Sequence, residues 1–293
     1  MGHIPVLLNE VLEILNPKPG QTFIDLTING GGHAKEIAGR IGDEGMVAGI
    51  DWDCGQIEDL KKKTKEEGIT NLTLICDNYA NLKRICAEYS LGAPDGILAD
   101  LGFSSNQLEG VARGFSFLKG EALDMRYSAN SGLSSAADVV NGFSRMDLER
   151  IIKDYGEDRF AKRIAEAIVD SRKKKRIETT GELSRIISGA VSRREKIHPA
   201  TRVFQALRIF VNRELENIKT MIPQAIEMVH SGGVIVIISF HSLEDRIVKN
   251  AFREAQKAGI VAILTKKPIM ATREEIKINS RSRSAKLRAV KKI

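Results

Sequence analysis

The chain has few cysteines and histidines, and their spacing excludes the common disulfide and metal patterns. Its 293 residues include five histidines and three cysteines, Cys54, Cys76 and Cys86. An odd number of cysteines without CxxC spacing argues against a disulfide framework or a zinc site, and it fits a reducing cytoplasm. The histidines are scattered rather than spaced as metal ligands. We therefore expect a cytoplasmic protein that holds no metal.

Long hydrophobic runs are also missing. No apolar stretch reaches the roughly 20 residues that a membrane-spanning helix requires. The first residues lack the basic segment and apolar run of a signal peptide. Hydrophobic residues nevertheless make up 42% of the chain, which is enough for the core of one large domain or two modest ones. We expect no membrane partner.

Excess positive charge is absent from most of the chain and concentrated in its last part. The whole sequence has a net charge of +7, whereas residues 266–293 alone hold ten Lys and Arg and two acids, a net charge of +8. Localised positive charge is typical of a protein that binds a polyanion such as RNA. We expect Arg281, Arg283 and Arg288 to contact RNA; the alternative is a solvated basic tail without a partner.

The most informative segment present is residues 23–33, where a short apolar strand runs into three glycines and then a helix-like stretch. Glycine lets the backbone adopt positive φ and approach a ligand, and the helix N-terminus supplies N–H donors. Gly31, Gly32 and His33 are therefore candidate cofactor ligands. The alternative is an ordinary glycine turn of an α/β protein, because such a turn alone is a weak signal.

Asp51 ends the next apolar run, 19 residues beyond Gly32. That is near the spacing at which an acid binds ribose hydroxyls in nucleotide-cofactor sites. The dinucleotide fingerprint would need a glycine at position 35, where this chain has Lys35. A cofactor without pyrophosphate, such as S-adenosylmethionine, does not need that close approach of the helix.

Strand and helix patterns alternate at first and then give way to helices. Apolar runs at 22–27, 46–51, 72–76 and 96–100 alternate with helix-like segments, which predicts a parallel sheet with crossover helices. From about 109 to 200 only amphipathic helical patterns appear, with helix caps at Ser144-x-x-Asp147 and Thr179-x-x-Glu182. The sheet pattern returns at 234–239, 260–264 and 287–290.

The sequence therefore predicts an α/β, Rossmann-like fold with an inserted all-helical domain. We assign residues 1–108 and 201–293 to the α/β domain and 109–200 to the insertion, which would recognise the substrate. The insertion leaves after the fourth strand, where α/β sheets place their ligands. A long helix is expected over 201–229, interrupted near Pro223.

Asp100 ends the fourth predicted strand, so its carboxylate should point toward the cofactor cleft; a turn cap is the alternative. The loop that follows holds arginines and aromatics, as in Arg113–Phe117, which suit an unstacked base but could equally be packing. The basic run 172–176 could contact RNA or interact with a helix dipole. For His198 and His241 we expect substrate positioning or structural hydrogen bonding.

Taken together, these motifs resemble the MraW family of small-subunit (16S) ribosomal RNA cytosine-N4-methyltransferases. The resemblance runs nearly end to end and includes residues 3–8, Gly31-Gly32-His33, Asp100-Leu101-Gly102-Phe103-Ser104-Ser105, Gln107-Leu108, Arg113-Gly114-Phe115-Ser116-Phe117, Leu123-Asp124-Met125-Arg126, and the segments 155–161, 198–208, 239–246 and 279–288. Many long motifs in the same order make the resemblance specific.

The resemblance implies a class I S-adenosylmethionine-dependent methyltransferase fold and a cytidine of the ribosomal decoding region as target. It implies a donor site formed by Gly31, Gly32, His33, Asp51, Tyr79, Asp100 and Gln107. The chain departs from the family at Asn29, usually glycine, and at Tyr79, usually phenylalanine, which keeps the aromatic face. Asn29 must tolerate the turn geometry, and asparagine adopts the left-handed conformation more readily than most residues.

For catalysis we expect Asp100 to accept an N–H hydrogen bond from the target amine, while positioning supplies most of the rate. Two other functions remain open on the sequence: a DNA amino-methyltransferase, and a non-catalytic RNA-binding protein that retains the fold. The expected partner is small-subunit ribosomal RNA or the assembled small subunit. The oligomeric state, monomer or homodimer, stays open.

Overall fold

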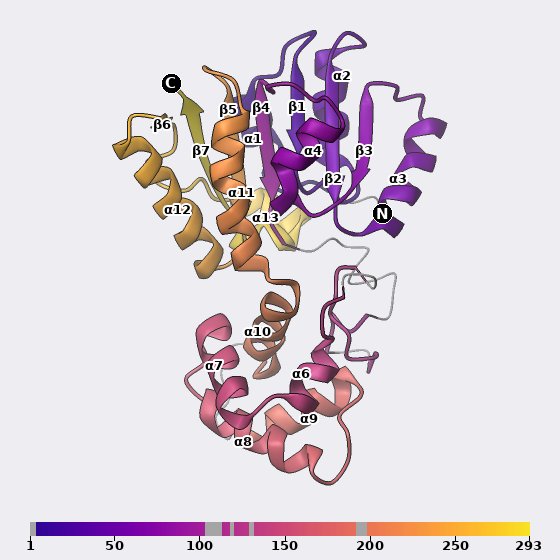
Figure 1. Ribbon diagram of the computed structural model, residues 1–293, viewed down its shortest axis with the longest axis vertical. Helices are drawn as coiled ribbons and strands as arrows, with labels where there is room; N and C mark the ends of the chain where they lie inside the picture. The colour runs from indigo at the N-terminus through magenta and orange to yellow at the C-terminus, as the bar shows by residue number, and fades with distance from the viewer. Residues whose placement is uncertain (1–3, 103–112, 118–119, 129–131, 192–197) are drawn as a thin grey trace. The chain divides into compact units, whose positions relative to one another are not determined.

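The computed structural model describes residues 4–102, 113–117, 120–128, 132–191 and 198–293. The chain divides into two compact units. Unit 1 comprises residues 1–104 and 215–293, and unit 2 comprises residues 105–214. Figure 1 gives the element labels used below.

Unit 1 is built on a seven-stranded sheet with strand order β3-β2-β1-β4-β5-β7-β6. The strands are β1 Thr22–Asp25, β2 Met46–Asp51, β3 Leu72–Cys76, β4 Gly96–Asp100, β5 Val234–Ser239, β6 Val261–Ile263 and β7 Lys286–Lys292. β1 to β5 pair in parallel, whereas β7 runs antiparallel between β5 and β6. The predicted α/β fold is confirmed.

Helices cover both faces of this sheet (Figure 1). They are α1 Leu8–Leu15, α2 Gly32–Ile41, α3 Cys54–Glu66, α4 Leu82–Glu88, α11 Glu214–Met228, α12 Ser242–Lys257 and α13 Arg273–Ile278. Alternate strand residues bury toward one face, so that Phe23, Val47 and Leu98 share a core with α1, α2 and α3. Three of the parallel strands end in a carboxylate residue: Asp25 in β1, Asp51 in β2 and Asp100 in β4.

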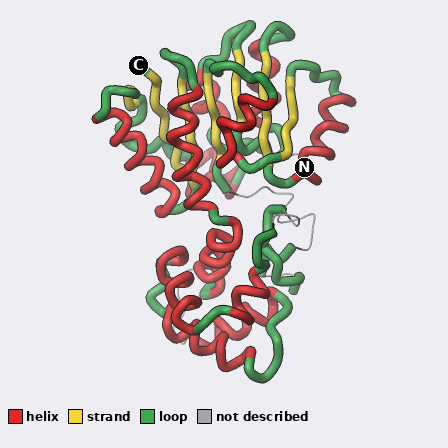
Figure 2. The backbone as a smooth tube through the Cα atoms, in the orientation of Figure 1, coloured by secondary structure: helices red, strands yellow, loops and turns green. Residues whose placement is uncertain are grey.

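Unit 2 contains α6 Ala136–Gly142, α7 Arg145–Gly156, α8 Ala161–Arg172, α9 Thr180–Ala190 and α10 Ala200–Asn212. Figure 2 shows helices and loops but no strand over the residues of this unit that the structure describes. The predicted caps are present: the Ser144 side chain accepts from the Asp147 N–H, and Thr179 and Glu182 form a reciprocal capping box. Apolar stripes of these helices form a core of their own.

The expected long helix is broken at Arg213 and not at Pro223. Arg213 adopts a left-handed conformation with φ 52°, which ends α10, and its N–H donates to the Ile209 and Phe210 carbonyls. Pro223 lies inside α11. In consequence α10, which the sequence placed in the α/β domain, belongs to unit 2, and the helical unit ends at residue 214 rather than 200.

The basic C-terminal segment forms an interior part of the sheet rather than a tail. β7 pairs with β5 along its length and with β6 on its other side. Arg288 is 8% exposed, and its guanidinium holds Asp245 of α12 with hydrogen bonds of 2.6 and 3.3 Å. The expectation that Arg288 contacts RNA is therefore wrong, because this side chain anchors α12 to the sheet.

The run 172–176 makes contacts within unit 2. Arg172 donates to the Val140 carbonyl, and Lys175 and Arg176 form ion pairs with Glu182 and Asp138. These contacts favour a local structural role for the run. Within the described ranges, no helix has both the length and the apolar character that a bilayer crossing requires.

Candidate functional site

The turn between β1 and α2 has the left-handed backbone that its glycines predicted. Asn29 has φ 47° and Gly31, the N-cap of α2, has φ 78°. The Asn29 side chain stabilises the turn by donating to the Thr27 carbonyl at 2.8 Å. Asparagine therefore supports this left-handed geometry. No side chain of the described residues caps α2 at its N-cap, which leaves the helix end suited to an anion.

Asp51 connects the end of β2 to this turn. One carboxylate oxygen accepts the Asn29 N–H at 3.0 Å, and the other accepts the Asp53 N–H at 2.9 Å. Asp51 is 9% exposed. A carboxylate has about four lone-pair sites, so acceptor capacity remains for a ligand. Asp51 is thus linked by a hydrogen bond from Asn29 to the turn that contains Gly31, so these two sequence-based candidates lie in one region.

Asp100 at the end of β4 has a carboxylate oxygen without a partner. Its backbone N–H donates to the Thr27 hydroxyl at 2.6 Å. Its side chain is buried, and Oδ1 has no hydrogen-bond partner among the residues that the structure describes. Buried acceptors are rarely left unpaired in folded proteins. An oxygen in this state at a strand end is suited to accept a hydrogen bond from a bound ligand.

His33, in the first turn of α2, lies beside Asp100. Its Nδ1 is 3.8 Å from Asp100 Oδ2, and its Nε2 is 2.9 Å from the Val6 carbonyl oxygen. Two residues near the end of the chain hold the segment that contains Val6. Glu275 accepts the Leu7 N–H at 2.8 Å, and Asn279 donates to the Ile4 carbonyl at 3.0 Å. The ring of His33 is therefore positioned by contacts outside its own helix.

Three buried carboxylates end neighbouring strands. Burial raises the pKa of Asp25 to about 7, and the charge of Asp51 adds to this. Burial also raises the pKa of Asp51 to about 6. The pKa of Asp100 is raised well above its usual value by burial and by the charges of Asp25 and Glu244. Such a cluster favours a ligand that carries positive charge.

Sequence reasoning missed Asp25 and Thr27 as members of this site. Asp25 ends β1 just as Asp51 and Asp100 end β2 and β4. The same argument from strand ends at a parallel sheet would have found it. Thr27 could not be found in this way, because its hydroxyl acts on a backbone N–H from another strand.

Tyr79 and the cysteines lie at the end of β3. Tyr79 is half-buried and begins the 3-10 turn Tyr79–Asn81. Cys76 at the end of β3 forms a disulfide with Cys54 at the start of α3. The expectation against disulfides is wrong for this pair. The segment that follows β2 lies next to Cys76 because β2 and β3 are adjacent parallel strands, which the spacing of the cysteines does not show. Gln107 lies outside the described residues.

The arginine-aromatic loop packs within unit 2. Arg113 donates to the Tyr127 carbonyl at 2.9 Å, and the Phe115 and Tyr127 rings stack with centroids 5.6 Å apart. Phe117 stacks on His198 at 4.7 Å. Of the two readings of this loop, these contacts favour packing. His198 also accepts the Ala200 N–H at 3.2 Å, so its expected structural hydrogen bonding is present.

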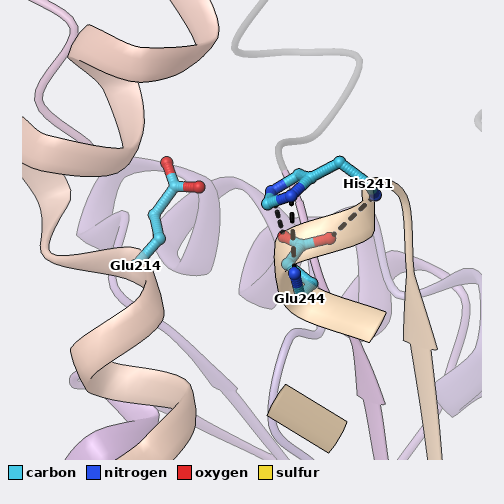
Figure 3. Close-up of side chains that lie close together, drawn as sticks. All are labelled: Glu214, His241 and Glu244. Atoms are coloured by element: carbon cyan, nitrogen blue, oxygen red, sulfur yellow. Dashed lines mark hydrogen bonds and ion pairs between the residues drawn. The ribbon is translucent and has the colours of Figure 1, made fainter. Parts of the chain in front are cut away.

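His241 and Glu244 form the cap of α12 (Figure 3). Glu244 accepts the Phe240 N–H at 2.8 Å and the His241 N–H at 3.3 Å, and the imidazole lies 3.1 Å from the carboxylate. Glu244 is almost fully buried. The expected structural hydrogen bonding of His241 is present.

Comparison with known proteins identifies the family of the chain. The sequence profile described as the MraW methylase family matches residues 1–293. The chain is 45% identical to ribosomal RNA small subunit methyltransferase H of Clostridioides difficile strain 630, over 99% of each chain. It is 46% identical to the protein of the same name from Persephonella marina, again over 99% of each.

Among solved structures, an rRNA methylase from Streptococcus thermophilus matches with a TM-score of 0.46 at 10% identity, over 98% of this chain and 93% of that one. The family match over residues 1–293 and the full-length similarity to these relatives identify the family. The chain belongs to the MraW methylase family.

Proposed function

We propose that this protein transfers a methyl group from S-adenosylmethionine to the exocyclic N4 of a cytidine in the decoding region of small-subunit ribosomal RNA. The observation that carries the proposal is the unpartnered Asp100 Oδ1, which lies at the end of β4 next to His33. Family membership and the similarity to small-subunit methyltransferases support the choice of RNA.

The residues present fit the proposed donor. Asp51 would accept hydrogen bonds from the ribose hydroxyls. The N-terminus of α2 at Gly31, Gly32 and His33 would bind the carboxylate of S-adenosylmethionine. Tyr79 would stack on the adenine, and Gln107 is assigned to the same site from the family resemblance. The buried carboxylates Asp25, Asp51 and Asp100 would lie near a ligand that carries positive charge on sulfur and nitrogen, which offsets their burial.

When bound, S-adenosylmethionine supplies an electrophilic methyl group on a positively charged sulfur. The protein's part is to orient the acceptor. Asp100 Oδ1 accepts one N–H of the cytosine amine and turns the nitrogen lone pair toward the methyl carbon. Asp100 would take the proton that the cytosine amine loses when it is methylated. The raised pKa of Asp100 makes its carboxylate a better base than an exposed one.

The proposed partner is small-subunit ribosomal RNA, free or in the assembled subunit, in the cytoplasm. The proposal includes no metal and no membrane. It does not choose between a monomer and a homodimer. The cytosine N4 position is the part of the proposal that rests on the family resemblance alone.

Methyl transfer from labelled donor tests the proposal. Naked small-subunit RNA, assembled small subunits and duplex DNA should be offered separately, and the modified nucleoside identified by mass. We expect label in N4-methylcytidine of RNA or subunits only. Label in DNA would favour a DNA amino-methyltransferase, and RNA binding without transfer would favour a non-catalytic RNA-binding protein. Asp100→Asn is the matched low-activity control.

A further inference from the structure

A basic cavity lies near the β6 edge of the sheet, away from the strands that end in Asp25, Asp51 and Asp100. It has a volume of about 240 Å³ and is formed by α12, β6 and β7. β6 is three strands away from β4 in the sheet order, which corresponds to ~14 Å at the usual strand spacing. The cavity is therefore separate from the site around Asp100.

Three cations surround this cavity. Lys249 and Arg253 are four residues apart on α12 and so share one helix face, and Lys266 approaches from the segment after β6. No acidic residue lines the cavity. Within the described ranges, none of these three side chains forms an ion pair with a carboxylate. Their charges repel one another unless an anion lies between them.

The fourth cation in the wall, Arg288, has a different role. Its charge is neutralised by Asp245, which also lies 3.7 Å from Lys286. The Arg288–Asp245 contact fixes α12 against β7 and so holds the wall that carries Lys249 and Arg253. The charge of Lys249 also acts on Asp245 and lowers its pKa. The positive field of the cavity therefore comes mainly from Arg253 and Lys266, on a scaffold that the Arg288–Asp245 pair fixes.

The other walls limit the size and type of ligand. Phe252 and Ile263 contribute apolar surface, and the Thr265 hydroxyl accepts the Ala289 N–H at 2.9 Å, which leaves its own proton for donation. A volume of about 240 Å³ is below the usual ~300–1,000 Å³ of sites for drug-sized ligands. It is suited to a phosphate group with part of its sugar.

We propose that this cavity binds a backbone phosphate of the RNA substrate through Lys249, Arg253 and Lys266. The proposal rests on the proposed RNA methyl-transfer function and adds a second contact, away from the methylated base. Of the basic C-terminal segment, it uses Lys266, whereas Arg288 is used in the fold.

The test compares two triple variants with equal loss of charge. In the first, Lys249→Gln, Arg253→Gln and Lys266→Gln remove the charges of the cavity. In the control, Lys62→Gln, Lys63→Gln and Lys65→Gln remove three exposed charges from α3. Binding of small-subunit ribosomal RNA is measured by fluorescence anisotropy over a range of salt concentrations, and folding is checked by thermal melting.

We expect the cavity variant to bind RNA roughly tenfold to a hundredfold more weakly, the loss expected for a charged hydrogen-bond partner. The slope of log affinity against log salt should fall by about 0.7–0.9 for one lost phosphate contact. The α3 control should keep the wild-type slope. At saturating RNA the cavity variant should keep its kcat, with a raised KM for RNA and unchanged donor affinity.

An unchanged salt slope in a folded cavity variant would overturn the proposal, and so would an equal loss in the α3 control, which would indicate net charge alone. Pyrophosphate is the probe for a general anion site: if it binds the cavity but the variant's RNA slope is unchanged, the site is not for RNA. RNA binding that depends on the cavity without any methyl transfer by the wild-type protein would refute the methyl-transfer function and leave the cavity proposal standing.

Discussion

The unpartnered oxygen of Asp100 leads to the most direct prediction for a single residue. Asp100→Asn keeps the shape and one acceptor oxygen but removes the charge and the base. We expect turnover to fall by ~10²–10⁴, the range for a positioned acid–base group, with a smaller change in KM. Single-turnover methyl transfer at saturating donor and RNA measures the step itself. A near-normal rate together with weaker donor binding would reassign Asp100 to holding the donor.

Asp51 gives a second prediction, on donor affinity. Asp51→Ala removes a charged acceptor and should weaken S-adenosylmethionine binding by about 1–3 kcal/mol. Because Asp51 also accepts the Asn29 and Asp53 N–H groups, the variant's stability must be measured beside calorimetric binding. Asp43→Ala, an exposed acid beyond the end of α2, is the control and should bind as wild type does. Equal affinities in both variants would remove Asp51 from the site.

For single residues, the sequence was informative where a polar residue follows directly on an apolar run or a glycine marks a turn. Asp51 and Asp100 could be found because each ends an apolar run, and the turn at Gly31 because of its glycines. The role of Arg288 could not be found, since its partner Asp245 is 43 residues away and a basic segment looks the same whether it is solvated or paired. Pairing is decided by the packing of α12 on β7.

At the scale of elements, the contact between α12 and β7 leads to a prediction on stability. Burial raises the pKa of Asp245, but the hydrogen bonds and charge of Arg288 outweigh this effect, so the pKa is lowered. Arg288→Gln leaves Asp245 with only the longer Lys286 contact of 3.7 Å, so we expect the free energy of unfolding to fall by about 1–3 kcal/mol near pH 7. The loss should shrink as pH falls through the lowered pKa of Asp245.

Urea denaturation of wild type, Arg288→Gln, Asp245→Asn and the double variant gives the coupling energy of the pair. Lys291→Gln, an exposed cation on the same strand, should leave stability unchanged. Additive effects of the two single substitutions would show that the pair does not anchor α12.

At the scale of elements, the sequence predicted the strands closely because each is a short apolar run between turns. It placed the break of the long helix at Pro223, whereas α11 accommodates this proline and the chain breaks at Arg213. A left-handed arginine has no signature in the sequence. The boundary of the helical unit follows from that break, so it was misplaced with it.

For the whole molecule, the raised carboxyl pKa values predict an unusual dependence of stability on pH. Asp25 and Asp51 hold their protons more tightly in the folded state, with pKa values of about 7 and 6, than in the unfolded chain at about 4. Their contribution to stability is complete below pH 4 and is lost as pH rises through 6 and 7. Donor-free protein should therefore be less stable at pH 7.5 than at pH 5, by on the order of 3 kcal/mol.

The range from pH 5 to 7.5 isolates this effect, because carboxyls with lowered pKa, such as Glu182 at about 2, are ionised in both states there. Saturating S-adenosylmethionine should reduce the difference, since a cationic ligand favours the ionised carboxylates. Chemical denaturation at the two pH values, with and without donor, measures both effects. Stability that rises over this range in donor-free protein would contradict the raised pKa values, and Asp25→Asn should flatten the profile.

The links between the two ends of the chain have a consequence for biosynthesis. The segment that positions His33 is held by Glu275 and Asn279, and β7 completes the middle of the sheet. During translation these residues emerge some 240 positions after His33, so a nascent chain lacks both the contacts that hold the segment beside His33 and an interior strand of the sheet. We therefore expect a chain that ends before Glu275 to lack methyl-transfer activity.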